Sequence, residues 1–156
     1  MKRLKYGDDF NTLVFVYGSL KRGMAHHQLI EEAVWIGEGS IAALALYDLG
    51  PFPMAVADSS ASLPIQGELY QVSAELLQQL DRFEGSPRLY ERQRQVLMDG
   101  RIAWVYMGQA RQVRHATLIS SGCWQGPQPR FRRRNQPPTS APQPPALSVF
   151  SHQVIQ

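Results

Sequence analysis

The stretch Thr12-Leu-Val-Phe-Val-Tyr-Gly-Ser-Leu20 carries the strongest local signal in the chain. Its first six residues favour a β-strand and give way abruptly to Gly18, which is typical of a buried strand that ends in a loop. A turn of this composition can direct several backbone N–H groups at one point and so bind an anion. A carboxylate fits better than a triphosphate, because Met24-Ala25 stands where a P-loop requires Lys and Ser or Thr. The alternative is that Gly18-Ser19 is only a tight turn.

The segments after this loop predict several strands and two helices. Residues 24–33 have the pattern of a short helix. Strand-like patterns cover parts of 34–49 and the segments 65–72, 90–98 and 102–107. The last two flank Asp99-Gly100, a strong hairpin signal. Since strands and helices do not alternate regularly, the pattern favours an α+β fold built on a mixed or largely antiparallel sheet that can close as a barrel.

The clearest helix is predicted over residues 74–83. Ser73 is a good N-cap, and Glu75 places negative charge in the first turn, where the helix dipole favours it. Gly85 is a natural stop. The apolar residues recur at helical spacing and share one face: Leu76, Leu77, Leu80 and Phe83.

Glu84 lies at the end of this predicted helix, where the dipole disfavours a negative charge. Burial in apolar surroundings would act in the same direction and raise its pKa. A carboxyl group with a pKa near neutrality suits general acid–base catalysis. The alternative is a surface carboxylate paired with Arg82 or Arg88.

Composition bounds the remaining possibilities. A chain of 156 residues with 44% hydrophobic and 19% charged residues is expected to build one globular core. No apolar run is long enough to span a membrane, and no apolar segment follows the basic start as in a secretory signal. The single cysteine, Cys123, excludes an internal disulfide and a multi-cysteine metal site, and it favours a reducing, cytoplasmic location. The adjacent His26 and His27 do not have the spacing of a metal-binding pair, so no metal is expected.

The composition changes after Trp124. Residues 125–156 contain seven of the eleven prolines and no acidic residue, which predicts a folded domain over 1–124 and an extended tail over 125–156. The basic excess of the chain comes from four arginines of this tail, so it predicts no nucleic acid in the pocket. The tail is either a contact for a protein partner or an extended segment without one, and the sequence leaves the oligomeric state open.

Six blocks occur in a fixed order along the chain: residues 15–23 (Phe-Val-Tyr-Gly-Ser-Leu-Lys-Arg-Gly), 66–70 (Gln-Gly-Glu-Leu-Tyr), 80–85 (Leu-Asp-Arg-Phe-Glu-Gly), 90–92 (Tyr-Glu-Arg), 104–106 (Trp-Val-Tyr) and 119–124 (Ile-Ser-Ser-Gly-Cys-Trp). In this order they resemble the γ-glutamylcyclotransferase-like family, which includes γ-glutamylamine cyclotransferase and the AIG2-like proteins. The resemblance covers roughly residues 13–124. One departure is Cys123, which stands where the family commonly has Asp.

The resemblance implies a small mixed β-barrel with flanking helices and a pocket at one end. It implies that Glu84 is the catalytic residue, and that the substrate-binding residues are Tyr17, Gly18, Ser19, Leu20 and Tyr90. The implied reaction cyclises a γ-glutamyl amino acid or γ-glutamyl amine to 5-oxoproline and releases the amine. It needs no cofactor, because the attacking amine and the carbonyl belong to one molecule. Two alternatives are a non-catalytic pocket protein that binds a small carboxylate, and a scaffold whose tail recruits a partner.

Overall fold

The computed structural model describes residues 12–128. Residues 1–11 and 129–156 lie outside this part, and with them most of the tail predicted for 125–156. Within the described residues, no helix has the length and apolar character needed to cross a membrane. The elements follow one another as β1 (Thr12–Val16), η1 (His27–Leu29), β2 (Val34–Ile41), β3 (Leu44–Asp48), β4 (Pro53–Ala57), β5 (Ile65–Val72), α1 (Ala74–Phe83), β6 (Glu91–Val96), β7 (Ile102–Met107), η2 (Ala110–Val113) and β8 (Thr117–Leu118).

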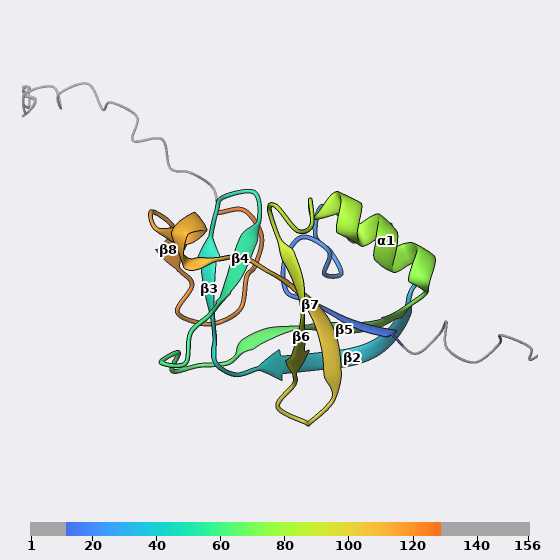
Figure 1. Ribbon diagram of the computed structural model, residues 1–156, viewed down its shortest axis with the longest axis horizontal. Helices are drawn as coiled ribbons and strands as arrows, with labels where there is room; N and C mark the ends of the chain where they lie inside the picture. The colour runs from blue at the N-terminus through green and yellow to red at the C-terminus, as the bar shows by residue number, and fades with distance from the viewer. Residues whose placement is uncertain (1–11, 129–156) are drawn as a thin grey trace, which may run out of the picture.

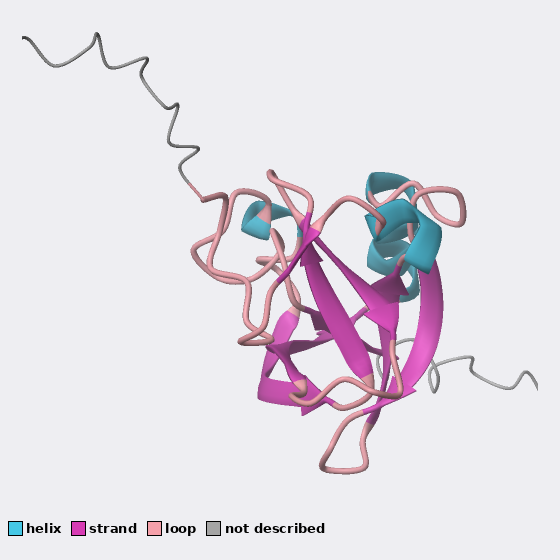
Figure 2. Ribbon diagram, turned by 90° about the vertical axis from the view of Figure 1, so that its left-hand side faces the viewer, coloured by secondary structure: helices cyan, strands magenta, loops and turns pink. Residues whose placement is uncertain are grey.

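The strands form one curled sheet in the order β2-β5-β1-β7-β4-β3-β8, with β6 paired to β7. Figures 1 and 2 show the curl, with α1 lying beside one end of it. Most neighbours are antiparallel, whereas β7 runs parallel to β1 and β4. The result is a half-barrel of mixed strands with few helices, which confirms the predicted α+β class.

The sheet branches at β7. Strand β6 pairs with one edge of β7 from Glu91 to Val96. The opposite edge is shared, because β1 pairs with it at Trp104 and β4 pairs with it at Met107. Because β1 and β4 pair with successive parts of the same edge of β7, they diverge from each other between these two pairing points. The candidate site described below lies at this separation.

Strand β1 is buried on both faces of the sheet. Phe15 packs inside the curl with Leu69 and Val105. On the other face, Val14 and Val16 pack in the cluster that contains Leu80 of α1. A strand covered on both sides needs apolar residues at consecutive positions rather than in alternation. This explains the continuous apolar run from Leu13 to Tyr17.

Helix α1 has the predicted bounds. The Ser73 side chain accepts a hydrogen bond from the Leu76 N–H (3.1 Å) and so caps the N-terminus. Leu80 is 1% exposed and anchors the helix to the sheet. Gly85 follows the last turn with a φ of 63°, a left-handed conformation that glycine adopts without strain.

Two expectations from the sequence need correction. The helix predicted over 24–33 is wrong, since only the 3₁₀ segment η1 forms there. The reason is that successive N–H groups bond three residues back, as Leu29 does to His26 and Ile30 to His27, which produces a series of tight turns. Strand β4 was not anticipated, because its sequence begins at Pro53 and contains alanines, which rarely signal a strand.

The closing segment returns to the sheet. The Gly122 carbonyl accepts a hydrogen bond from the Gln66 N–H (2.8 Å), and Trp124 is 3% exposed. In the same segment, the Cys123 N–H donates to Oγ of Ser121 (3.3 Å). A neighbouring serine therefore supplies a local hydrogen bond to this turn.

Candidate functional site

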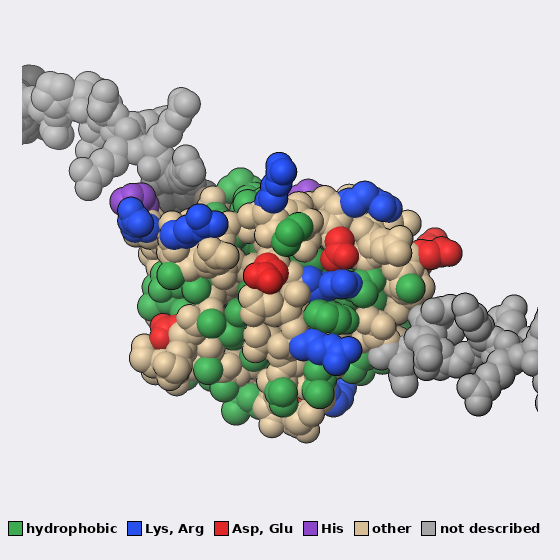
Figure 3. All heavy atoms as spheres, viewed as in Figure 1, with side chains coloured by type: hydrophobic (Ala, Val, Ile, Leu, Met, Phe, Trp, Pro, Cys, Tyr) green, Lys and Arg blue, Asp and Glu red, His purple; other side chains and the backbone are tan. Residues whose placement is uncertain are grey.

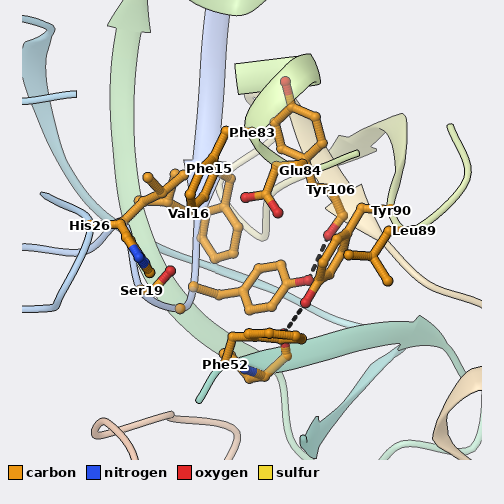
Figure 4. A pocket seen from close by; sticks show the side chains of 14 residues that line it. Phe15, Val16, Ser19, His26, Phe52, Phe83, Glu84, Leu89, Tyr90 and Tyr106 are labelled. Atoms are coloured by element: carbon orange, nitrogen blue, oxygen red, sulfur yellow. Dashed lines mark hydrogen bonds between the residues drawn. The ribbon is translucent and has the colours of Figure 1, made fainter. Parts of the chain in front are cut away.

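A cavity of about 190 Å³ opens where β1 and β4 separate. Its lining combines the loop that follows β1, the start of β4, the end of α1, and residues of the segments that follow α1 (Figure 4). A space of this size can hold one small ring-sized ligand. All of the site residues predicted from the sequence line it: Tyr17, Gly18, Ser19, Leu20, Glu84 and Tyr90.

Glu84 is the C-cap of α1, and its carboxylate points into the cavity (Figure 4). Its backbone N–H donates to the Leu80 carbonyl (2.8 Å), so the main chain is still part of the helical turn. Among the described residues, neither Arg82 nor Arg88 forms an ion pair with it. Burial among apolar side chains raises the pKa of Glu84 from 4.5 to about 7. Glu84 therefore exchanges a proton near neutral pH.

The loop after β1 has its carbonyl groups occupied. The Gly18 carbonyl accepts from the Lys21 N–H (3.1 Å), the Ser19 carbonyl from the His26 N–H (2.9 Å), and the Leu20 carbonyl bonds to Nδ1 of His27 (2.9 Å). None of the hydrogen bonds found between described residues uses the N–H groups of Gly18, Ser19 or Leu20. These three donors therefore have no partner within the described residues, and the residues that carry them line the cavity. The anion-binding role predicted for this loop stays a prediction.

Tyr17 has a different position from the other loop residues. Its hydroxyl donates to the Tyr106 carbonyl (2.5 Å) and accepts from the Ala55 N–H (3.0 Å). Both partners are main-chain groups of strands that border the branch, so the hydroxyl links the end of β1 to β7 and β4. Burial raises the pKa of Tyr17 well above its usual value, and the hydroxyl stays protonated.

Tyr90 forms another wall. Its hydroxyl donates to the Pro53 carbonyl (2.8 Å), and its side chain is buried. Burial also raises the pKa of Tyr90, with the nearby Glu84 carboxylate as a second cause. The hydroxyl is therefore a neutral donor already engaged with the start of β4.

Several lining residues were not among the predicted site residues. They are Phe15, Val16, His26, Phe52, Pro53, Phe83, Leu89 and Tyr106. Phe83 and Leu89 are 38% and 45% exposed, and the Phe83 ring lies 5.0 Å from that of His26. Phe83 was predicted on the apolar face of the helix, and it lies at the end of α1 that lines the cavity. No local signal marks Phe52, because its place in the site depends on the branch of the sheet.

Glu68 of β5 supports the loop from outside the cavity. It is 8% exposed, and its two carboxylate oxygens accept from the Arg22 N–H at 2.7 and 3.3 Å. The Arg22 guanidinium in turn lies 3.4 Å from the centroid of the Trp35 ring. The sheet thus holds the far end of the loop that begins at Tyr17.

We expect Glu68→Ala to lower the free energy of unfolding by about 1.5–3 kcal/mol, the usual value of a hydrogen bond to a charged group. Glu68→Gln keeps one acceptor oxygen and should lower the free energy of unfolding by clearly less than Glu68→Ala. Urea denaturation of both variants measures the difference. Equal losses would show that the carboxylate does not act through this bond.

Glu84 also makes stability depend on pH. Its pKa in the folded state, about 7, lies above the ordinary value of 4.5, so folding favours the protonated form. The resulting stabilisation is fully present below pH 4.5 and is lost as the pH rises through 7. At pH 8, Glu84→Gln should therefore raise the free energy of unfolding by on the order of 2–3 kcal/mol, and at pH 4 by almost nothing. Parallel stability curves of wild type and variant from pH 4 to pH 8 would contradict the burial of this carboxyl group.

Within residues 12–128, no group of three or more His, Cys, Asp or Glu side chains is placed to hold a metal ion. The chemistry available in the cavity is thus that of one carboxyl group with a raised pKa, the His26 imidazole, the Ser19 hydroxyl, unused backbone N–H groups and aromatic walls. This combination can bind a small carboxylate and move a proton beside it.

Comparison with known proteins identifies the family. Residues 14–126 match the family model described as gamma-glutamyl cyclotransferase, AIG2-like. The chain is 36% identical over 111 residues to the gamma-glutamylcyclotransferase family protein ytfP of Citrobacter rodentium (71% of this chain, 93% of that protein). It is 37% identical over 92 residues to human gamma-glutamylaminecyclotransferase (52% of this chain, 58% of that protein).

The solution structure of ytfP from Escherichia coli has the same fold, with a TM-score of 0.56 and 36% identity over 72% of this chain and 96% of that one. The family match, the curated relatives and the shared half-barrel agree over the segment that builds the cavity. The chain belongs to the AIG2-like gamma-glutamyl cyclotransferase family.

Proposed function

We propose that this protein is a γ-glutamylcyclotransferase, which converts a γ-glutamyl conjugate into 5-oxoproline and a free amine. The observation that carries the proposal is the position of Glu84. A carboxyl group with a pKa of about 7 shares a small cavity with three unused backbone N–H groups. The name of the human relative, a γ-glutamylaminecyclotransferase, supports the same class of substrate.

In the proposed complex, the N–H groups of Gly18, Ser19 and Leu20 bind the α-carboxylate of the substrate. This fixes one end of the γ-glutamyl group, so that the α-nitrogen and the γ-carbonyl carbon of the same molecule can approach each other. Binding replaces free rotation of the chain by one folded arrangement, which accelerates ring closure.

Glu84 acts as base and then as acid. In its ionised form it accepts a proton from the α-ammonium group, and the freed amine attacks the γ-carbonyl carbon. The new C–N bond closes the five-membered ring, and the bond from that carbon to the leaving nitrogen breaks. Glu84 returns this proton to the leaving nitrogen. The ring nitrogen loses its second proton as it becomes an amide, and the released amine takes up that proton and leaves as an ammonium ion, so that no proton is consumed overall and neither water nor a cofactor enters the balance.

The leaving group would face the apolar part of the lining. Phe52, Phe83 and Leu89 stand around it, and burial of a second carboxylate against them is unfavourable. We therefore expect conjugates of alkyl or aryl amines to react faster than conjugates of amino acids. The single cysteine of the chain fits action in the reducing cytoplasm.

The test is incubation of the protein with a panel of γ-glutamyl amines and γ-glutamyl amino acids, with release of 5-oxoproline measured by mass spectrometry. The proposal requires release from at least one conjugate, at a rate proportional to enzyme concentration. Binding of conjugates without release from any of them would instead identify a non-catalytic carboxylate-binding protein.

A further inference from the structure

Tyr106 contacts both halves of the candidate site. It lies on β7, at the branch of the sheet, and is 3% exposed. Its carbonyl accepts the hydrogen bond of Tyr17, the residue from which the 17–20 loop begins. Its hydroxyl points the other way and donates to Oδ1 of Asp81 on α1 (2.7 Å), with a longer contact of 3.4 Å to the Leu77 carbonyl. One residue thus connects the loop with the helix that carries Glu84.

Asp81 is itself held from a second direction. Nε of Arg92 lies 3.5 Å from Oδ1 of Asp81, and the Arg92 guanidinium lies over the Trp104 ring at 4.5 Å. Basic side chains lie on this face of β6 and β7 (Figure 3). The Asp81 carbonyl also accepts from the Ser86 N–H (2.9 Å), which closes the turn after Glu84. The segment 81–86 is therefore tied to the sheet through Asp81, and the turn that carries Glu84 is closed on the same residue.

We propose that Tyr106 is a positioning residue, whose hydroxyl holds Asp81 and thereby keeps the carboxylate of Glu84 in register with the backbone N–H groups of the 17–20 loop. The inference rests on the proposed function, because it assigns Tyr106 a part in the same reaction without contact with the reacting atoms.

The need for such a tie follows from the place of Glu84. The last turn of a helix frays easily, since its final carbonyl groups lack partners within the helix. An ionised carboxylate is more stable in water than in an apolar cavity. A small movement of the last turn would bring the Glu84 carboxylate into contact with water. The bond between Tyr106 and Asp81, one turn before Glu84, opposes that movement. Burial and the Asp81 bond raise the pKa of Tyr106, so the hydroxyl keeps the proton that it donates.

The kinetic experiment compares Tyr106→Phe with Tyr70→Phe. Both remove only a hydroxyl from a buried tyrosine, but the Tyr70 hydroxyl has no hydrogen-bond partner among the described residues. For Tyr106→Phe we expect kcat to fall about 10–100-fold, as for an ångström-scale misplacement of a reacting group, with KM nearly unchanged. Tyr70→Phe should remain near wild type. A kcat for Tyr106→Phe within about twofold of the Tyr70→Phe value would overturn the proposal.

Asp81 tests the same bond from its other end. Asp81→Leu removes the acceptor and should lower kcat about as much as Tyr106→Phe, while the double variant should be no slower than either single one. Asp81→Asn keeps Oδ1 as an acceptor, so its kcat should stay much closer to the wild-type value than that of Asp81→Leu. Additive losses in the double variant would show that the two residues act separately and would contradict the proposal. If Tyr106→Phe were too unstable to assay, equal rates for Asp81→Leu and Asp81→Asn would contradict it.

A second readout does not depend on turnover. With ¹³C-labelled glutamate, the carboxyl resonance of Glu84 can be titrated in wild type, Tyr106→Phe and Tyr70→Phe. Release of the last turn into water should lower the pKa of Glu84 from about 7 towards 4.5 in Tyr106→Phe alone. An unchanged pKa would overturn the positioning role. If the wild-type protein released no 5-oxoproline from any conjugate, the proposed function would fail on its own, and this titration would still decide whether Tyr106 positions Glu84.

Discussion

Replacement of Glu84 by Gln should lower the rate of 5-oxoproline release by a factor of about 10² to 10⁴, the usual effect of losing a general acid–base. Glutamine has nearly the same shape but cannot accept the proton of the α-ammonium group. The fold should persist, because no hydrogen bond of the Glu84 side chain is found among the described residues and the amide removes a buried charge. The substrate should still bind through the N–H groups of Gly18, Ser19 and Leu20.

Glu75→Gln is the matched control, since it changes an exposed carboxylate in the first turn of the same helix. It should leave the rate unchanged. In the wild type, kcat/KM should rise with pH through about 7, as Glu84 ionises and becomes able to act as a base. Turnover retained by the folded Glu84→Gln protein would remove Glu84 from the mechanism.

The second large effect concerns stability. Tyr17→Phe should lower the free energy of unfolding by roughly 2–5 kcal/mol, because it leaves two buried main-chain groups, the Tyr106 carbonyl and the Ala55 N–H, without the hydroxyl that each now contacts. The ring is kept, so the loss reports the hydroxyl alone. Thermal or urea denaturation at constant pH measures it.

Tyr70→Phe again serves as control, because its buried hydroxyl has no partner among the described residues and its loss should cost little or even stabilise the fold. A Tyr17→Phe protein as stable as this control would contradict the bridging role of the Tyr17 hydroxyl. It would also favour a direct part for that hydroxyl in substrate binding, as the family resemblance first suggested for Tyr17.

The two predictions share a structural cause. The site lies where β1 and β4 leave a common edge of β7. The Tyr17 hydroxyl links main-chain groups of β7 and β4 at this point, and the cavity lies between the separating strands. Stability and ligand binding therefore meet at one point of the fold, although different residues carry them.

Much of the local structure could be predicted from the sequence. Strand β5 and helix α1 have the predicted bounds, since a continuous β-favouring run, a Ser73 cap and Gly85 act over a few residues. The 24–33 segment was predicted wrongly because its composition suits a helix, whereas its main chain follows tight turns that return to the Ser19 carbonyl. In this segment, hydrogen bonds to the loop after β1 outweighed the helix propensity of the residues.

The sequence by itself determined the bounds of strand β5 and helix α1, the Gly18 turn that follows β1, and the carboxylate that ends helix α1. These features depend on side chains and capping groups within a few positions of each other. Only the tertiary structure decided that the Tyr17 hydroxyl bonds to Ala55 and Tyr106, which lie 38 and 89 positions further along the chain. The tertiary structure also decided that Phe52 lines the cavity and that the pKa of Glu84 reaches about 7. Each of these results from the burial and pairing of groups that only folding brings together, and no local pattern encodes it.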